Sequence, residues 1–214
     1  MRSKIQLLIP MAVLASVLAA CLVTGNVYAI TNGQPDGNAP PYVGLIVFDA
    51  APGHPAWRCT GTLLSPTVVL CAGHCTEGAV AGRVWFDEVV QGNPDYPYGG
   101  PSAHEIIEIH TNPQLVIGGG KGLPGFDTHD VGILVLASPV YMSTYGELPT
   151  QGLVDTLPMK TNVDLVGYGV QDLLRGGGKP VWTGLRNRFY APAQLDMAEF
   201  KWSNEFVRLP ANLS

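Results

Sequence analysis

The sequence is poor in charged residues and has no excess of positive charge. Asp, Glu, Lys and Arg make up 14% of the 214 residues, whereas hydrophobic residues make up 46%. A chain with so little charge and so much apolar material can build a packed core, which excludes an intrinsically disordered protein. The formal net charge of -5 leaves no basic stripe to neutralise phosphates, so charge excludes a nucleic-acid partner.

Long amphipathic helices and internal repeats are also missing. The 26 glycines and 18 prolines are spread along the chain, which is typical of many short strands joined by tight turns. We therefore predict an all-β protein. Strands are expected at residues 42–48, 58–64, 67–72, 84–87, 105–110, 131–136, 163–170, 186–190 and 201–207.

Two finer patterns accompany these strands. Ile107 and Ile109 alternate with Glu108 and His110, which predicts that the isoleucines face the core and the polar residues face solvent. Residues 112–126 are rich in glycine and proline and predict a long surface loop. Residues 139–160 contain turn residues without a sustained period, so we expect a connector between two halves.

The N-terminus has the pattern of an export signal. Arg2 and Lys4 precede the apolar run from Ile5 to Val23, and Val27-Tyr28-Ala29 provides a cleavage site. We expect residues 1–29 to be a signal peptide and the mature, secreted chain to begin at Ile30.

Two other interpretations of this leader stay open. The apolar run is nearly long enough for a membrane-spanning helix, although it contains Pro10. Leu18-Ala19-Ala20-Cys21 resembles a bacterial lipoprotein box, in which Cys21 would become the lipidated first residue. Contact with a membrane is therefore expected only through the leader or through Cys21.

Cysteine is scarce, and one of the four cysteines lies in the leader. The mature chain would keep Cys59, Cys71 and Cys75. Because an exported chain meets an oxidising compartment, we expect one disulfide and one remaining thiol.

Residues 59–75 read Cys-Thr-Gly-Thr-Leu-Leu-Ser-Pro-Thr-Val-Val-Leu-Cys-Ala-Gly-His-Cys. This stretch resembles the trypsin/chymotrypsin family of serine peptidases, whose first barrel carries Cys-x-Gly-(Ser/Thr)-Leu, a turn, and then Thr-Ala-Ala-His-Cys. The resemblance implies a disulfide between Cys59 and Cys75 and makes His74 the general base.

A second element, Thr128-His129-Asp130-Val-Gly-Ile-Leu-Val-Leu136, is similar to the family's Asn-Asp-Ile-Ala-Leu-Leu-x-Leu. The resemblance gives Asp130 the role of orienting the catalytic histidine through its Nδ1–H. The alternative is an aspartate at a strand edge that caps a turn. Asp127 and His129 are expected to be solvated loop residues.

Cys71 stands where the family usually has threonine. One interpretation is a small buried hydrophobic residue with an idle thiol. The other is a zinc site that gathers Cys59, Cys71, His74 and Cys75. The spacing matches no common zinc knuckle and a second ligand pair is absent, so we expect no metal and no cofactor.

Two further elements resemble the same family. Ile30-Thr-Asn-Gly33 is similar to the mature Ile-Val-Gly-Gly end, and Gly167-Tyr-Gly169 is similar to the Gly-Trp-Gly that opens the second barrel. The resemblance implies a double six-stranded antiparallel β-barrel. The first barrel would span residues 30–140, the connector residues 141–160, and an incomplete second barrel residues 161–214.

The family's Gly-Asp-Ser-Gly-Gly-Pro does not occur in the sequence. The resemblance thus implies a secreted trypsin-like serine endopeptidase, acting on protein or peptide substrates, whose printed chain lacks the nucleophile segment and is inactive by itself. One alternative is a protease-like fold kept as a non-catalytic binding module. Another is a domain completed by a second chain that supplies the serine.

Overall fold

A computed structural model describes residues 33–117, 129–169, 172–174, 181–183 and 185–195. The expected signal peptide, the expected mature end at Ile30, the predicted strand at residues 201–207 and most of the glycine-rich loop lie outside these residues. Among the described residues, no helix is long and apolar enough to cross a membrane. The helical elements there are α2 (Gly73–Thr76) and the 3-10 turn η1 (Val154–Thr156).

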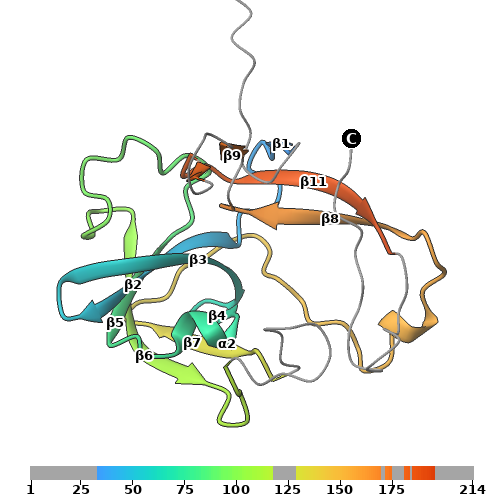
Figure 1. Ribbon diagram of the computed structural model, residues 1–214, viewed down its shortest axis with the longest axis horizontal. Helices are drawn as coiled ribbons and strands as arrows, with labels where there is room; N and C mark the ends of the chain where they lie inside the picture. The colour runs from blue at the N-terminus through green and yellow to red at the C-terminus, as the bar shows by residue number, and fades with distance from the viewer. Residues whose placement is uncertain (1–32, 118–128, 170–171, 175–180, 184, 196–214) are drawn as a thin grey trace, which may run out of the picture.

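The first half of the chain is a closed antiparallel barrel (Figure 1). Its strands follow the order β2-β3-β4-β7-β6-β5 around the barrel. Their bounds are β2 (Val43–Ala51), β3 (His54–Ser65), β4 (Val68–Cys71), β5 (Ala81–Trp85), β6 (Ala103–Thr111) and β7 (Gly132–Leu136). Closure pairs every strand on both sides, so no barrel edge is left open.

Two smaller sheets lie outside the barrel, and all of their strands except the N-terminal β1 come from the second half of the chain. β1 (Gln34–Pro35), β11 (Phe189–Gln194) and β8 (Asn162–Gly167) form a three-stranded antiparallel sheet, which lies above the barrel in Figure 1. β9 (Asp172–Leu174) pairs with β10 (Val181–Thr183). The predicted all-β class is therefore confirmed, and the 139–160 segment joins the two halves without a strand.

Small residues let the barrel close tightly. Gly44 in β2 lies opposite Gly61 in β3. A Cβ at Gly61 would lie 2.6 Å from the Ile46 side chain, and one at Gly44 would lie 2.7 Å from that of Val84. Since real Cβ atoms do not approach so closely, these two glycines are required by packing against the core rather than by backbone conformation.

The alternation predicted for this strand is confirmed at Ile109, which packs against the core, and at the exposed Glu108 and His110. It is wrong at Ile107. Ile106 is buried, whereas Ile107 is 58% exposed. Ile106 pairs with Leu136 and Glu108 pairs with Val135, so the ladder carries one extra residue between them. This β-bulge shifts the faces of the strand by one position, and a pattern read with a strict period of two therefore assigns Ile107 to the wrong side.

The strand predicted at residues 186–190 begins later, at Phe189. The residues before it bridge the halves instead: the backbone N–H groups of Val90 and Gln91 donate to the Arg186 carbonyl, and Arg188 N–H donates to Glu88 O at 2.7 Å. A backbone used in this way cannot also join the β8 ladder, so β11 starts after it.

Arg188 is a fully buried cation that joins three parts of the chain. Its Nε donates to the Asp36 carboxylate, and its two terminal nitrogens donate to Val43 O at 2.8 Å, Phe86 O at 3.2 Å and Asn38 Oδ1 at 2.5 Å. The Arg188 and Asp36 side chains are 0% and 1% exposed. A buried charge is stable only when it is paired and hydrogen-bonded in this way.

Substitution Arg188→Met should destabilise the protein by about 3–5 kcal/mol, because it leaves the buried Asp36 carboxylate without a counter-charge. Urea unfolding measures the change. The double variant Arg188→Met/Asp36→Leu should recover most of the loss, since it removes both charges. Arg58→Met, at a half-buried arginine outside this network, serves as the control and should stay within about 0.5 kcal/mol; an equal loss there would contradict the explanation.

Candidate active site

Residue 74 lies on the single helical turn α2, which follows β4 directly. A Cβ at Gly73 would lie 2.9 Å from the carbonyl oxygen of Val131, so only glycine lets α2 approach β7 this closely. The buried Thr76 hydroxyl donates to Gly73 O at 2.8 Å and lies 2.7 Å from the hydroxyl of Thr111 on β6. These contacts fix a helix that is too short to be stable alone.

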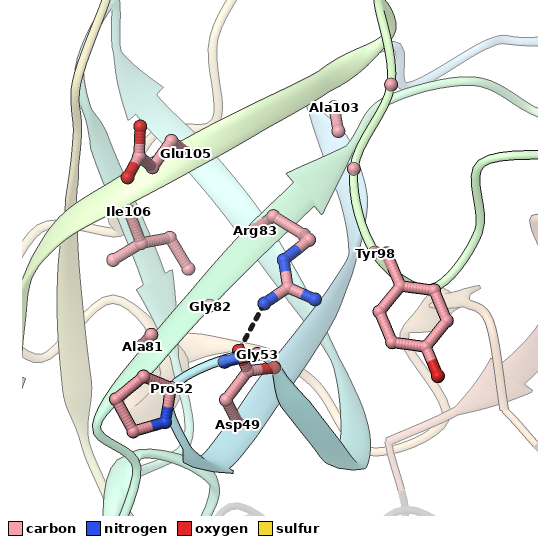
Figure 2. Close-up of a pocket in the computed structure, with 12 residues that line it drawn as sticks. Asp49, Pro52, Gly53, Ala81, Gly82, Arg83, Tyr98, Ala103, Glu105 and Ile106 are labelled. Atoms are coloured by element: carbon pink, nitrogen blue, oxygen red, sulfur yellow. Dashed lines mark hydrogen bonds and ion pairs between the residues drawn. The ribbon is translucent and has the colours of Figure 1, made fainter.

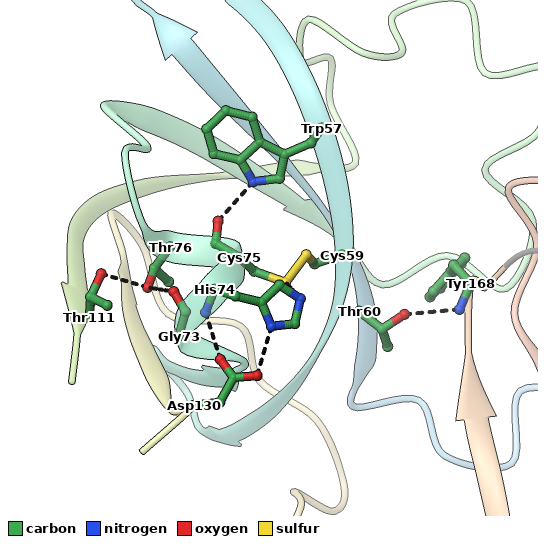
Figure 3. The surroundings of a disulfide bond; sticks show 10 residues. All are labelled: Trp57, Cys59, Thr60, Gly73, His74, Cys75, Thr76, Thr111, Asp130 and Tyr168. Atoms are coloured by element: carbon green, nitrogen blue, oxygen red, sulfur yellow. Dashed lines mark hydrogen bonds and ion pairs between the residues drawn. A yellow bond between two sulfur atoms is a disulfide. The ribbon is translucent and has the colours of Figure 1, made fainter. Parts of the chain in front are cut away.

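A disulfide anchors α2 from the opposite side (Figure 3). Cys59 on β3 is bonded to Cys75 on α2, across 16 residues of sequence. The pairing implied by the family resemblance is thus present. The Trp57 indole N–H donates to Cys75 O at 2.8 Å, so strand β3 holds both the side chain and the carbonyl of the residue that follows His74.

Asp130 lies two residues before the start of β7 and contacts His74 with both carboxylate oxygens. The backbone N–H of His74 donates to Oδ1 at 2.6 Å, and its ring Nδ1 donates to Oδ2 at 2.7 Å. A carboxylate at Nδ1 favours the tautomer that carries its proton there and leaves Nε2 unprotonated. Nε2 lies 3.5 Å from Cys75 Sγ, but this disulfide sulfur has no proton to donate, so the Nε2 lone pair stays available as an acceptor. The His74 side chain is 61% exposed and that of Asp130 is 24% exposed, so an external molecule can reach the ring.

The arrangement can therefore act as a general base. The free Nε2 can accept a proton from a hydroxyl group, and the adjacent carboxylate stabilises the imidazolium that forms. The sequence placed these two residues on separate motifs, 56 positions apart, and the barrel brings them into contact.

The remaining histidines stand apart from this pair. His110 contacts Glu108 at 2.8 Å on an exposed face, and His54 is exposed at the start of β3. His104 is half-buried against the ring of Phe86, and this burial lowers the pKa of the imidazole. His129 is half-buried, rather than the solvated loop residue expected, and Asp127 lies outside the described residues.

A metal site does not fit these residues as they stand. Ligand atoms of Cys59, His74 and Cys75 lie within 4.8 Å of one another, but the two sulfurs are bonded together. Zinc binds thiolates, and a disulfide offers none. Cys71 is buried and separate from this group.

A hydrogen bond between Tyr168 and Thr60, close to the disulfide, could not be predicted from the sequence. The backbone N–H of Tyr168 in the second half donates to Thr60 Oγ1 at 3.0 Å, beside Cys59 on β3. The buried Tyr168 hydroxyl donates to Asp87 O at 2.6 Å, and burial raises the pKa of this phenol. The Gly-Tyr-Gly element indicated a strand end, but its contact with Thr60 spans 108 positions and follows only from the packing of the two halves.

The closed first barrel, the second sheet, the disulfide and the His–Asp pair together define a chymotrypsin-like β-barrel protein. Comparison with known families gives the same result: the sequence matches the trypsin family over residues 31–187. The chain belongs to the trypsin family.

Individual relatives agree with this assignment. "Serine protease 1" and "Serine protease 2" of Drosophila melanogaster are each 34% identical to the chain over 85 residues, which is 39% of this chain and 31% of each relative. The match thus spans about a third of the length of these relatives. The solved structure of HL collagenase superposes with a TM-score of 0.58 and 17% identity, and covers 83% of this chain and 70% of that chain. This likeness confirms the trypsin-like fold.

Cys71 fills the barrel core as an unpaired thiol, 8% exposed. Burial, reinforced by the charge of Asp130, raises the pKa of this thiol from 9.0 to about 12. The thiolate fraction at pH 8 is therefore about a thousandfold lower than in the unfolded chain.

Iodoacetamide should thus leave Cys71 unmodified in the native protein at pH 8 and alkylate it after denaturation without reductant. Peptide mass mapping measures alkylation of the peptide that contains Cys71 separately from every other peptide. The folded state holds the Cys71 thiol proton more tightly than the unfolded chain does. This difference contributes to the free energy of unfolding in full below pH 9, and the contribution is lost as pH rises from 9 toward 12. Rapid native labelling would show that Cys71 is accessible and would contradict the burial.

Proposed function

We propose that this chain provides the general-base half of a secreted serine endopeptidase that hydrolyses protein or peptide substrates. The observation that carries the proposal is the double contact of His74 with Asp130, through Nδ1 at 2.7 Å and the backbone N–H at 2.6 Å. A pair held in this way suits catalysis better than a non-catalytic binding module, which needs no oriented imidazole.

In this mechanism a serine hydroxyl attacks the carbonyl carbon of the scissile peptide bond, and its proton moves to Nε2 of His74. Asp130 stabilises the resulting imidazolium through Nδ1–H. When the tetrahedral intermediate collapses, the C–N bond breaks and the leaving amine takes the proton from His74. A water molecule then attacks the carbonyl carbon of the acyl-enzyme and gives a proton to His74. The bond between this carbon and the serine oxygen breaks, the acid is released, and His74 returns the proton to the serine.

The serine is the part of the mechanism that the printed residues do not provide in a Gly-Asp-Ser-Gly-Gly context. The proposal therefore requires a segment that carries this nucleophile, either in the same polypeptide or in a second chain. We accordingly propose that residues 1–214 by themselves do not hydrolyse peptide bonds.

Sequencing the encoding DNA beyond codon 214 tests whether the same polypeptide supplies the serine. The protein or complex that contains the serine can then be assayed for cleavage of a fluorogenic peptide. In that product Asp130→Asn should lower kcat by about 10⁴-fold, because an amide that donates to Nδ1 imposes the wrong tautomer. His74→Ala should lower kcat at least as much. Variant His110→Ala, on an exposed face, should leave kcat unchanged.

An Asp130→Asn variant with full activity would show that the pair is structural only. Cleavage by the purified 214-residue chain, abolished by His74→Ala, would instead show that a serine within the printed sequence is the nucleophile.

Export is the second part of the proposal. The Cys59–Cys75 disulfide suits an oxidising compartment outside the cytosol, and residues 1–29 have the pattern of a signal peptide. N-terminal sequencing of the exported protein should therefore begin at Ile30. A mature chain that begins with a lipid-modified Cys21 would support the lipoprotein alternative and overturn cleavage after Ala29.

A further inference from the structure

The side chains around the disulfide include both of the ligand types that zinc prefers, sulfur and imidazole. Ligand atoms of Cys59, His74 and Cys75 lie within 4.8 Å of one another, in the one such group found among the residues that the structure describes. The covalent bond between the two sulfurs prevents metal binding in the oxidised protein. Reduction of this bond turns the group into three zinc ligands.

The distance between the His74 ring and Cys75 already suits a shared metal ion. Nε2 lies 3.5 Å from Cys75 Sγ. Zn–S bonds of about 2.3 Å and Zn–N bonds of about 2.0 Å at a tetrahedral angle place two such ligand atoms about 3.5 Å apart. The two sulfurs have to separate to about 3.8 Å for the same geometry, and reduction removes the bond that keeps them closer.

Asp130 provides the second hydrogen bond that a zinc-bound imidazole requires. A histidine that binds zinc through one ring nitrogen donates its other N–H to a carboxylate or a carbonyl. His74 Nδ1 donates to Asp130 Oδ2 at 2.7 Å, and Nε2, the nitrogen near Cys75, keeps its lone pair. The tautomer and the ring orientation for metal binding are therefore set before any metal arrives.

Contacts other than the disulfide hold the three ligands near one another. The Trp57 indole N–H donates to Cys75 O at 2.8 Å, and Asp130 accepts from the His74 backbone N–H at 2.6 Å. Cys59 belongs to β3, which is paired on both sides in the closed barrel. None of these hydrogen bonds involves sulfur, so we expect the ligands to stay close together after reduction.

The group is open to solvent on the side of the imidazole (Figure 3). The His74 side chain is 61% exposed and Cys59 is half-buried, so a reductant and a metal ion can both reach it. Three protein ligands and one position left for water is an arrangement that zinc adopts in proteins.

The charged hollow beside β5 is a poorer site for a cation. It has a volume of about 390 Å³ and is lined by Asp49 and Arg83. The Arg83 guanidinium donates to the Asp49 carboxylate at 2.5 Å (Figure 2) and to Pro97 O at 2.6 Å. A metal ion there would meet the positive charge of Arg83.

From these observations we propose that reduction of the Cys59–Cys75 disulfide creates a zinc site whose ligands are both sulfurs and His74 Nε2. A dithiol opens the bond by two thiol–disulfide exchanges, in which it is oxidised to its own disulfide and the cysteines become thiols. Zn²⁺ then displaces both thiol protons and binds the two thiolates. Because the metal uses the Nε2 lone pair, His74 cannot accept a proton while zinc is bound. Zinc binding itself does not depend on the proposed peptide hydrolysis.

Metal titration of the reduced 214-residue chain tests the proposal. Dithiothreitol reduces the protein and is removed without air before metal is added. The reduced chain should bind one equivalent of Co²⁺ with tetrahedral d–d bands and thiolate-to-cobalt charge transfer, and Zn²⁺ should displace the cobalt. The oxidised chain should show neither band. Absence of these bands after reduction would overturn the site, and so would loss of the near-UV circular dichroism that reports the packing of the buried Trp85.

Variants assign the ligands. Asp130→Asn should weaken zinc binding by about 10–100-fold, and His74→Ala should weaken it at least as much. Cys71→Ser and His110→Ala are the matched controls, because each removes the same kind of side chain outside the group, and both should leave the affinity unchanged. A loss in Cys71→Ser equal to that in His74→Ala, or no loss in Asp130→Asn, would show that zinc is held by other ligands and would overturn the proposal.

Discussion

The candidate site depends on the Asp130 carboxylate, which makes two separate hydrogen bonds with His74. Asp130 accepts from the ring of His74 and also from its backbone N–H. The first contact selects a tautomer, and the second fixes the position of the peptide unit that carries the ring. Because α2 is a single turn, it has no helical stability of its own, and its geometry follows from this carboxylate, the disulfide and the Thr76–Thr111 contact. A change in any of the three moves the imidazole.

Local sequence patterns picked out the two residues that the structure brings into contact, His74 and Asp130, but not the contacts that hold them in place. The Cys-x-x-His-Cys and His-Asp-Val elements identify His74 and Asp130 as candidates because both lie beside strongly apolar strands, and strands of this kind can be recognised within a few residues. The disulfide followed from the family resemblance. The same patterns failed at Ile107, where a bulge breaks the period of two, since a bulge depends on the partner strand rather than on the strand itself.

The long-range polar contacts were out of reach of sequence reasoning for a related reason. Arg188 and Asp36 are 152 positions apart, and Thr60 and Tyr168 are 108 apart. Nothing in the residues around Arg188 distinguishes it from the other arginines, because what makes it special is the set of carbonyls and carboxylates that surround it after folding. The two Arg–Asp ion pairs found among the described residues, Arg188–Asp36 and Arg83–Asp49, lie where segments distant in sequence meet.

The Arg188 network also has a consequence for the order in which the protein can be made. Asp36 is among the first residues of the domain to leave the ribosome, and Arg188 follows 152 residues later. Domains tend to fold as the chain emerges, so β2 to β7 can pair while Asp36 still lacks its partner. Until then its carboxylate has to remain in water. The segment that is synthesised first is therefore among the last to settle, and nascent chains stalled before residue 188 should keep their N-terminal end open to proteases.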